Sequence, residues 1–212
     1  MRITKIENQK KRPSRKSVFI DGAFAFGVSD EVLLRHSLRQ GDEVNQETVD
    51  RIVHSEDEEE AKQKAFRFLG IRPRSKKEIR DYLSKKSFAG DVVEHTVAKL
   101  ESLKMLDDLE FSRMVCRDML LRKPAGEKML RQQLFKKGVP KELADTVVAE
   151  FSTPEAELMM AVQAAERQSA KFERSSKKLD GALLKKKILD YLMRRGFDFD
   201  TAMNATKHLR LR

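Results

Sequence analysis

Side chains that could do acid–base, nucleophilic or metal chemistry are few in this sequence, and their spacing argues against catalysis. Cys116 lies in the middle of an expected helix, where a small core residue is favoured over a nucleophile. The adjacent carboxylates Asp107 and Asp108 stand at a helix entrance, where capping of backbone N–H groups explains them better than proton transfer. The histidines are scattered, and no pair has metal-ligand spacing on one helix face; they are His36, His54, His95 and His208. We therefore expect no catalytic residue, no metal site and no cofactor.

Basic pairs are the chemical feature that recurs at equivalent positions. Lys85-Lys86, Lys136-Lys137 and Arg194-Arg195 each stand just before the end of an expected helix. A cation at that place interacts favourably with the C-terminal end of the helix dipole, which needs no partner. The same pairs would also form a periodic row of cations suited to a polymer with repeating acidic groups. The two interpretations are compatible, since one cation can face the helix end while the next projects.

Charge is distributed unevenly along the 212 residues, whose net charge is +10. Residues 1–20 hold seven Lys/Arg against one Glu, and residues 167–212 hold thirteen against five Asp/Glu. Basic ends around a mildly acidic centre favour a polyanionic partner, nucleic acid being the commonest. The alternative is that the charge serves solubility alone. The candidate partner- or DNA-binding residues are twelve cations in the basic pairs and beside them: Arg72, Arg74, Lys76, Lys85, Lys86, Arg122, Lys123, Arg131, Lys136, Lys137, Arg194 and Arg195.

The first fifty residues have the pattern of a small β-hairpin extension with a short helix. Val18-Phe19-Ile20 and Ala23-Phe24-Ala25-Phe26 flank Asp21-Gly22, a dipeptide suited to the positive φ angles of a type I′ turn. Residues 3–6 form a plausible third strand, joined through a loop over Lys10 to Lys16. A short helix is expected from Asp30 to Leu38.

Helical periodicity begins near Ser55. Ser55 with Glu58, and Ser75 with Glu78, fit capping boxes, in which a hydroxyl and a carboxylate pair with otherwise unpaired backbone N–H groups. The acidic run from Glu56 to Glu60 is expected to be solvated at a helix N-terminus, where it would interact favourably with the dipole.

An internal repeat is the strongest signal of organisation. The segment 79–88 matches 188–197 at five of its ten positions, including Tyr82 and Tyr191, and 130–139 is a weaker third copy. In each copy an apolar residue and a Leu four positions later share one helix face. The fold class is therefore mainly α: tandem three-helix repeats forming an elongated curved solenoid with an N-terminal β-hairpin extension. Its domains are 1–54 for the extension and 55–106, 107–153 and 154–212 for repeats 1, 2 and 3.

Several motifs, in this order, resemble the RecX family of recombinase regulators. Residues 74–79 (Arg-Ser-Lys-Lys-Glu-Ile) resemble the signature of its first repeat, and residues 106–112 (Leu-Asp-Asp-Leu-Glu-Phe-Ser) resemble the entry to its second. Residues 134–139 resemble its Leu-x-Lys-Gly-apolar segment, and residues 3–6 and 24–28 resemble its hairpin extension. Ser112 replaces the usual Ala, and a proline stands in Lys123-Pro124-Ala125-Gly126.

The resemblance implies a non-enzymatic modulator of RecA. Such a protein would lie in the groove of the RecA–single-stranded DNA filament and restrain filament growth, ATP hydrolysis and strand exchange, with consequences for recombination, repair and the SOS response. The alternative is an autonomous nucleic-acid-binding protein with helix-turn-helix-like units, suggested by the basic ends and short helices. A cytoplasmic protein is expected in either case, because the single cysteine cannot form an internal disulfide and no apolar run is long enough to cross a bilayer. The protein is also expected to be a monomer. Binding to single-stranded DNA is expected to be weak.

Overall fold

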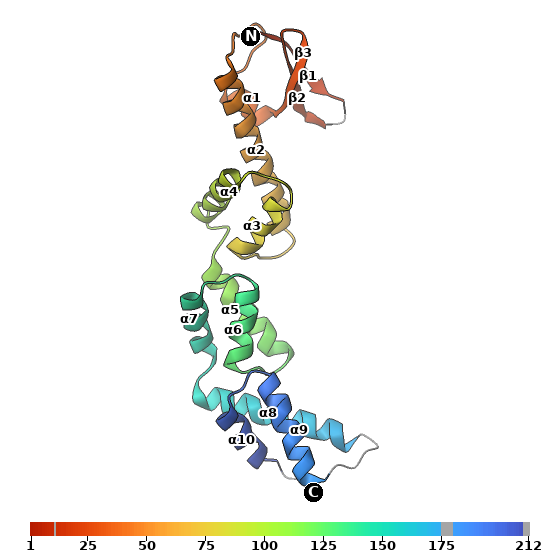
Figure 1. Cartoon of the computed structure of the whole chain (residues 1–212), viewed down its shortest axis with the longest axis vertical. Helices are drawn as coiled ribbons and strands as arrows, with labels where there is room; N and C mark the ends of the chain where they lie inside the picture. Colours follow the sequence, from red (N-terminus) through yellow and green to blue (C-terminus); the bar gives the residue numbers. More distant parts are fainter. Residues whose placement is uncertain (11, 175–179, 210–212) are drawn as a thin grey trace. The chain divides into compact units, whose positions relative to one another are not determined.

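The computed structural model describes residues 1–10, 12–174 and 180–209, which are mostly helical (Figure 1). Contacts divide the chain into two compact units. The first consists of Met1–Arg74 with Ile79–Leu106, and the second of Ser75–Glu78 with Asp107–Arg212. Each unit contains two hydrophobic clusters. The expected fold class of three-helix units behind a small N-terminal sheet is confirmed.

A three-stranded antiparallel sheet opens the first unit, with β2 in the centre. Its strands are β1 (Ile3–Gln9), β2 (Arg12–Ile20) and β3 (Ala23–Ser29). The φ angles of Asp21 and Gly22 are 49° and 87°, as the predicted hairpin turn requires. The prediction of a loop from Lys10 to Lys16 is wrong, because β2 begins at Arg12 and contains most of these residues.

Two helices follow the sheet. The short α1 (Asp30–Arg35) begins where the Ser29 hydroxyl accepts the Val32 N–H, close to the predicted position. The long α2 (Gln46–Leu69) is capped by Asn45, so the Ser55 cap predicted from sequence is wrong. Residue 55 lies inside α2, and the boundary predicted after residue 54 therefore falls within a continuous helix.

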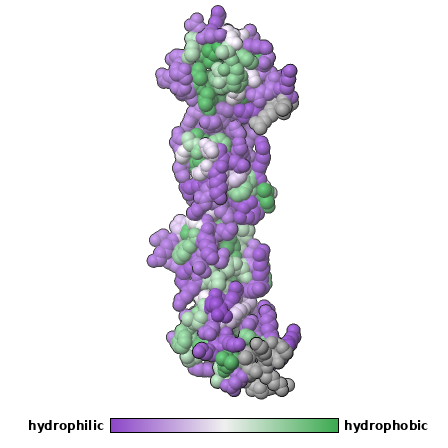
Figure 2. Space-filling model, turned by 45° about the vertical axis from the view of Figure 1, so that its right-hand side comes forward, coloured by the Kyte–Doolittle hydropathy of each residue, from purple (hydrophilic) through white to green (hydrophobic). Residues whose placement is uncertain are grey.

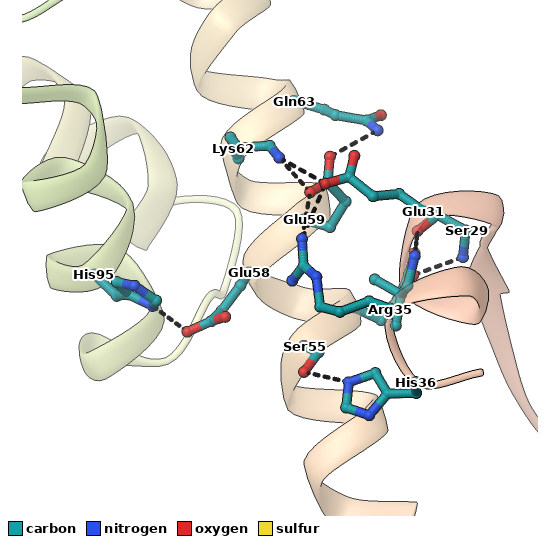
Figure 3. A network of polar contacts seen from close by, with 12 residues as sticks. Ser29, Glu31, Arg35, His36, Ser55, Glu58, Glu59, Lys62, Gln63 and His95 are labelled. Atoms are coloured by element: carbon teal, nitrogen blue, oxygen red, sulfur yellow. Dashed lines mark hydrogen bonds and ion pairs between the residues drawn. The ribbon is translucent and has the colours of Figure 1, made fainter. Parts of the chain in front are cut away.

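Buried carboxylates on α2 join this helix to the sheet. Glu56 accepts the backbone N–H of Ser29 at 2.6 Å and pairs with Arg15 on β2 at 2.8 Å. Glu59, whose side chain is only 3% exposed, pairs with Lys62 at 2.5 Å and lies 3.7 Å from Arg35 of α1 (Figure 3). The expectation that this acidic run is solvated is wrong for both carboxylates, because basic side chains and a backbone N–H of the preceding elements cover them.

The rest of the first unit packs around the second half of α2. Helix α4 (Gly90–Ser102) buries Val93, Val97 and Leu100, which follow one another by four and three positions and so share one helix face. Helix α3 (Lys76–Ser84) contributes two fully buried side chains to the same cluster, Ile79 and Leu83.

The second unit contains two three-helix groups. The first comprises α5 (Asp108–Arg122), α6 (Glu127–Lys136) and α7 (Lys141–Phe151), and the second comprises α8 (Pro154–Glu173), α9 (Gly181–Arg194) and α10 (Phe199–Lys207). The predicted apolar pairs of the middle helices are fully buried: Leu130 and Leu134 on α6, and Ile188 and Leu192 on α9.

The N-terminus of α6 meets the turn that follows α9. The Gly126 N–H donates to the carbonyl of Arg195 at 3.0 Å, and the Glu127 N–H donates to the carboxylate of Glu157 on α8 at 2.8 Å. Gly196 has φ of +86°, and a Cβ added there would lie 2.6 Å from Met129 Cβ. Glycine at this position therefore serves both the turn and the close approach of the two helix ends. We call this contact, between a helix N-terminus and the glycine turn of another helix, a joint.

Residues Ser75–Glu78, which belong to the second unit, form a second joint of this kind with α5 and the end of α6. The Ser75 hydroxyl donates to the carbonyl of Lys137 at 2.6 Å, and the Lys76 N–H donates to Asp108 at 3.0 Å. Gly138 has φ of +77°, and its added Cβ would lie 2.7 Å from Lys77 Cγ. The Ser75 hydroxyl also accepts the Glu78 N–H at 3.1 Å, which confirms the predicted cap at this helix.

Replacing the glycine of the α9 joint tests the close approach. We expect Gly196→Ala to lower the free energy of unfolding by about 1–3 kcal/mol more than Gly22→Ala does, because overpacking adds to a shared cost of positive φ. Gly22 is a matched control, since its φ of +87° is nearly the same and no atom lies within 4 Å of its added Cβ. Urea unfolding followed by circular dichroism measures both losses, and equal losses would contradict the role assigned to the joint.

Candidate nucleic-acid interface

Candidate catalytic and metal-binding side chains stay apart in the folded chain. Across the described ranges, no three His, Cys, Asp or Glu side chains gather closely enough to hold a metal ion. The His36 ring contacts the Ser55 hydroxyl at 2.9 Å, and the His95 ring contacts the Glu58 carboxylate (Figure 3). Asp107 caps α5 as predicted. These polar groups have structural partners that account for them.

Cys116 is a core residue of α5, as predicted. Its side chain is fully buried among the apolar residues of α5, α6 and α7. Burial raises the pKa of the thiol to about 11, and the nearby Glu150 charge contributes to the rise. The thiol therefore stays protonated at neutral pH and is a poor nucleophile.

Two of the cations predicted in repeat 1, Arg72 and Arg74, contact residues just before or after them in the sequence. The Arg74 guanidinium lies over the Phe68 ring, 3.8 Å from its centroid, and Phe68 in turn stacks on Tyr82 with centroids 4.1 Å apart. Arg72 donates to the Pro73 carbonyl at 2.8 Å. Arg74 thus completes a stack of flat groups at the end of α2.

Three of the predicted cations in the second unit have partners within that unit. Lys137 pairs with Glu78 at 2.8 Å. The Arg195 guanidinium donates to the Pro124 carbonyl at 2.6 Å and to the Lys123 carbonyl at 3.2 Å. Arg131, between repeated basic pairs, forms ion pairs of 2.5 and 2.7 Å with carboxylates on its own helix and on α7. The second member of each basic pair in this unit therefore stabilises a joint, whereas the first member projects.

The remaining predicted cations are exposed. They are Lys85 and Lys86 at the end of α3, Lys136 at the end of α6, Arg194 at the end of α9, and Arg122 and Lys123 at the end of α5. Lys76 is half-buried, and its contact with Asp108 is made by the backbone N–H.

Two of these exposed cations belong to a groove in the second unit. Arg122 and Lys123 line a hollow of about 430 Å³ together with α8 and the ring of Tyr191 on α9. The α8 side chains that line it include three more cations: Arg167, Lys171 and Arg174. We call this surface the α5/α8 groove. It brings together five cations, of which the sequence pattern identified only Arg122 and Lys123.

The three cations of α8 are not among the candidates predicted from the sequence, although their spacing indicates that they share one helix face. Residues 167, 171 and 174 follow one another by four and three positions, which places them on one helix face. Only the excess of positive charge over residues 167–212 was used to interpret this segment. A search for helical stripes of cations, in place of pairs, would have identified them.

The face drawn in Figure 2 is mostly hydrophilic, with apolar patches separated by polar side chains. Within residues 1–10, 12–174 and 180–209, no helix combines the length and the apolar character that crossing a bilayer demands.

Comparison with known families matches this arrangement segment by segment. Residues 1–45 match the Regulatory protein RecX N-terminal domain, and residues 61–100, 107–148 and 160–205 match the first, second and third three-helix domains of RecX. The chain belongs to the RecX family. This RecX-family chain is 31% identical to the Regulatory protein RecX of Listeria monocytogenes serotype 4a over 97% of its own length and 74% of that protein. It is 32% identical to that of Bacillus licheniformis over 93% of its length and 73% of that protein.

Solved RecX structures have the same fold. A crystal structure of regulatory protein RecX superposes with a TM-score of 0.74 at 24% identity, covering 94% of this chain and 96% of that one. RecX from Lactobacillus salivarius superposes with a TM-score of 0.64 at 22% identity, covering 73% of this chain and 97% of that one. The resemblance stated from sequence motifs is confirmed, and this RecX-family chain is a member of a family of regulators rather than enzymes.

Burial of Cys116 predicts a thiol that is inert in the folded chain. We expect an aromatic disulfide reagent at pH 8 to label it at least about a hundredfold more slowly in the native protein than in urea, since the raised pKa leaves little thiolate and the core blocks access. Absorbance of the released thiolate follows the reaction. Rapid labelling of the native protein would show that Cys116 is accessible and would contradict its placement in the core.

Proposed function

We propose that this RecX-family chain binds the RecA–single-stranded DNA filament and restrains filament growth, ATP hydrolysis and strand exchange. It would thereby take part in controlling recombination, DNA repair and the SOS response. The observation that carries the proposal is the ordered match of four RecX domains along the chain, together with relatives named Regulatory protein RecX. The protein would act as a cytoplasmic monomer without a cofactor.

Equivalent helix ends in the second unit support a repeating contact surface. The end of α6 exposes Phe135 beside Lys136, and the end of α9 exposes Met193 beside Arg194. An apolar side chain next to a cation is a small contact that binds weakly alone. Such contacts repeated along one chain suit a filament whose own subunits repeat, because linked weak contacts add up to a strong attachment.

The proposed repeats are 55–106, 107–153 and 154–212, behind the extension 1–54. The helix-end cations of repeat 1, Lys85 and Lys86, would extend the same series of contacts. The members of the pairs that project, rather than those that hold the joints, are therefore the residues to test.

Titration of the protein into RecA on single-stranded DNA tests the proposal. We expect RecA ATP hydrolysis to fall as the protein is added, and the effect to weaken between about 50 and 200 mM salt, because part of the binding depends on charge. No change in ATPase rate or in filament stability at several-fold excess over RecA would refute the proposal. Tight binding to one DNA sequence without RecA would instead support an autonomous DNA-binding protein.

Charge reversal at the two projecting cations tests the contact surface. We expect Lys136→Glu with Arg194→Glu to raise the concentration for half-inhibition of RecA about tenfold while leaving the circular dichroism spectrum unchanged. Lys185→Glu with Lys186→Glu is the matched control, since both residues are exposed on α9 and the net charge changes by the same amount. An equal effect of the two double variants would show that overall charge, and not these helix ends, determines the inhibition.

A further inference from the structure

The α5/α8 groove is lined by cations and contains no acidic side chain among its lining residues. Five of the ten residues around it are Lys or Arg, and the others are neutral. Two of the cations come from the end of α5, and three come from α8. All five are exposed, whereas the lining residues Pro124 and Ala164 are buried.

These five cations have no carboxylate partner among the residues that the structure describes. Other arginines of the same unit do: Arg113 pairs with Glu150 at 2.7 Å, and Arg131 pairs with Asp145 at 2.7 Å. Like charges that face one hollow repel each other, and a bound polyanion removes this repulsion while releasing counterions. The groove therefore suits a ligand with several negative charges.

One wall of the groove is held by Arg195. Its guanidinium donates to the Lys123 and Pro124 carbonyls, and its own carbonyl accepts the Gly126 N–H. Arg195 is a positioning residue, because it fixes the backbone that presents Lys123. A wall fixed before binding reduces the ordering cost of capturing a ligand.

Tyr191 is the one aromatic residue among the described residues that line the groove, and its equivalent in repeat 1 shows how such a ring can stack. There the equivalent Tyr82 is covered by the Phe68 ring, which lies parallel to it at 4.1 Å with an angle of 11°. Phe68 follows the buried Ala65 by three positions on α2. On α8 the buried Ala165 is followed at the same distance by Gln168, which lines the groove. Repeat 3 thus has the tyrosine, and among its described residues no ring stacks on it as Phe68 stacks on Tyr82.

We propose that the α5/α8 groove binds single-stranded DNA, with the five cations contacting phosphates and one base stacking on Tyr191 where Phe68 stacks on Tyr82. The choice of single-stranded DNA rests on the proposed function, whereas the groove and its ligand chemistry do not. A single strand offers free base faces together with its phosphates, and base–aromatic stacking is tolerant of sequence. A duplex keeps its bases stacked, and the Asp and Glu side chains of an acidic polypeptide have no ring that could stack on the tyrosine.

Binding of the full-length protein to labelled oligothymidylate, without RecA, tests the charged part of the groove. Fluorescence anisotropy at about 50 to 200 mM salt gives the affinity and its salt dependence. We expect Arg167→Glu with Lys171→Glu to weaken binding about tenfold or more and to reduce the salt dependence. The control Lys185→Glu with Lys186→Glu changes the net charge equally outside the groove, and we expect its affinity to stay within about threefold of the parent. Equal weakening by both would overturn the proposal in favour of diffuse attraction.

Two further variants test the stacking. We expect Gln168→Phe to cover Tyr191 as Phe68 covers Tyr82, and to weaken binding about tenfold with an unchanged salt dependence. Tyr191→Phe keeps a flat ring and should bind like the parent, whereas Tyr191→Leu should bind about tenfold more weakly. Gln168→Phe leaves the tyrosine in place, so a loss of binding there does not depend on the folding of a tyrosine variant. Parental affinity in Gln168→Phe would overturn the role of Tyr191.

Competition with polyglutamate and measurement of RecA inhibition complete the test. Displacement of the oligonucleotide by polyglutamate as efficiently as by unlabelled oligothymidylate would overturn the proposal and indicate an acidic polypeptide site. Failure to inhibit RecA with groove-dependent DNA binding intact would reject the proposed function and leave this inference standing. Inhibition of RecA with no groove-dependent DNA binding would reject the inference alone.

Discussion

The second unit depends on how the first backbone N–H groups of its helices find partners. A helix begins with donors that no residue of the same helix can satisfy. At α6 these donors are taken by a carboxylate from the next three-helix group and by the carbonyl that precedes a glycine turn. At Ser75–Glu78 a carboxylate again takes a backbone N–H, while the carbonyl before the glycine turn accepts the Ser75 hydroxyl. The joint requires a carboxylate, a cation and a left-handed glycine together. This requirement accounts for the likeness of Lys136-Lys137-Gly138 and Arg194-Arg195-Gly196.

The same joint forms one wall of the groove. The loop that joins α5 to α6 begins at Lys123 and ends at Gly126. The Arg195 side chain donates to the carbonyls of this loop, and the Arg195 carbonyl accepts the Gly126 N–H. A residue that stabilises the packing of two helix groups therefore also places a candidate ligand-binding cation. Burial raises the pKa of the Glu157 carboxyl, although its hydrogen bond with the Glu127 N–H acts in the opposite direction. The stability of the joint and the shape of the groove are thus coupled through a few polar contacts.

The elements whose signals are local could be predicted from the sequence. Asp21-Gly22 contains its own turn preference, and the apolar pairs of α6 and α9 need only helical spacing. The buried Glu56 and Glu59 could not be predicted as such, because Arg15, Arg35 and the Ser29 N–H that cover them come from elements distant in the sequence. Arg122 and Lys123 were identified as candidates, but their meeting with α8 depends on the packing of α8 beside the α5 loop. The presence of Tyr191 and Gln168 in the lining of one groove likewise depends on how α8 and α9 pack.

Ser87 stands where Gly138 and Gly196 stand in the other two copies, and it also has a positive φ, of 63°. The two glycine turns fit against a helix N-terminus only because they lack a Cβ, and Ser87 has one. Its turn is exposed and ends α3 without a joint of this kind. A single residue, Ser in place of Gly, therefore distinguishes the turn of the first copy from the turns of the other two. Because Ser87 carries a Cβ at the place where the other two turns have none, its turn does not suit the close contact that the glycine turns make with a helix N-terminus.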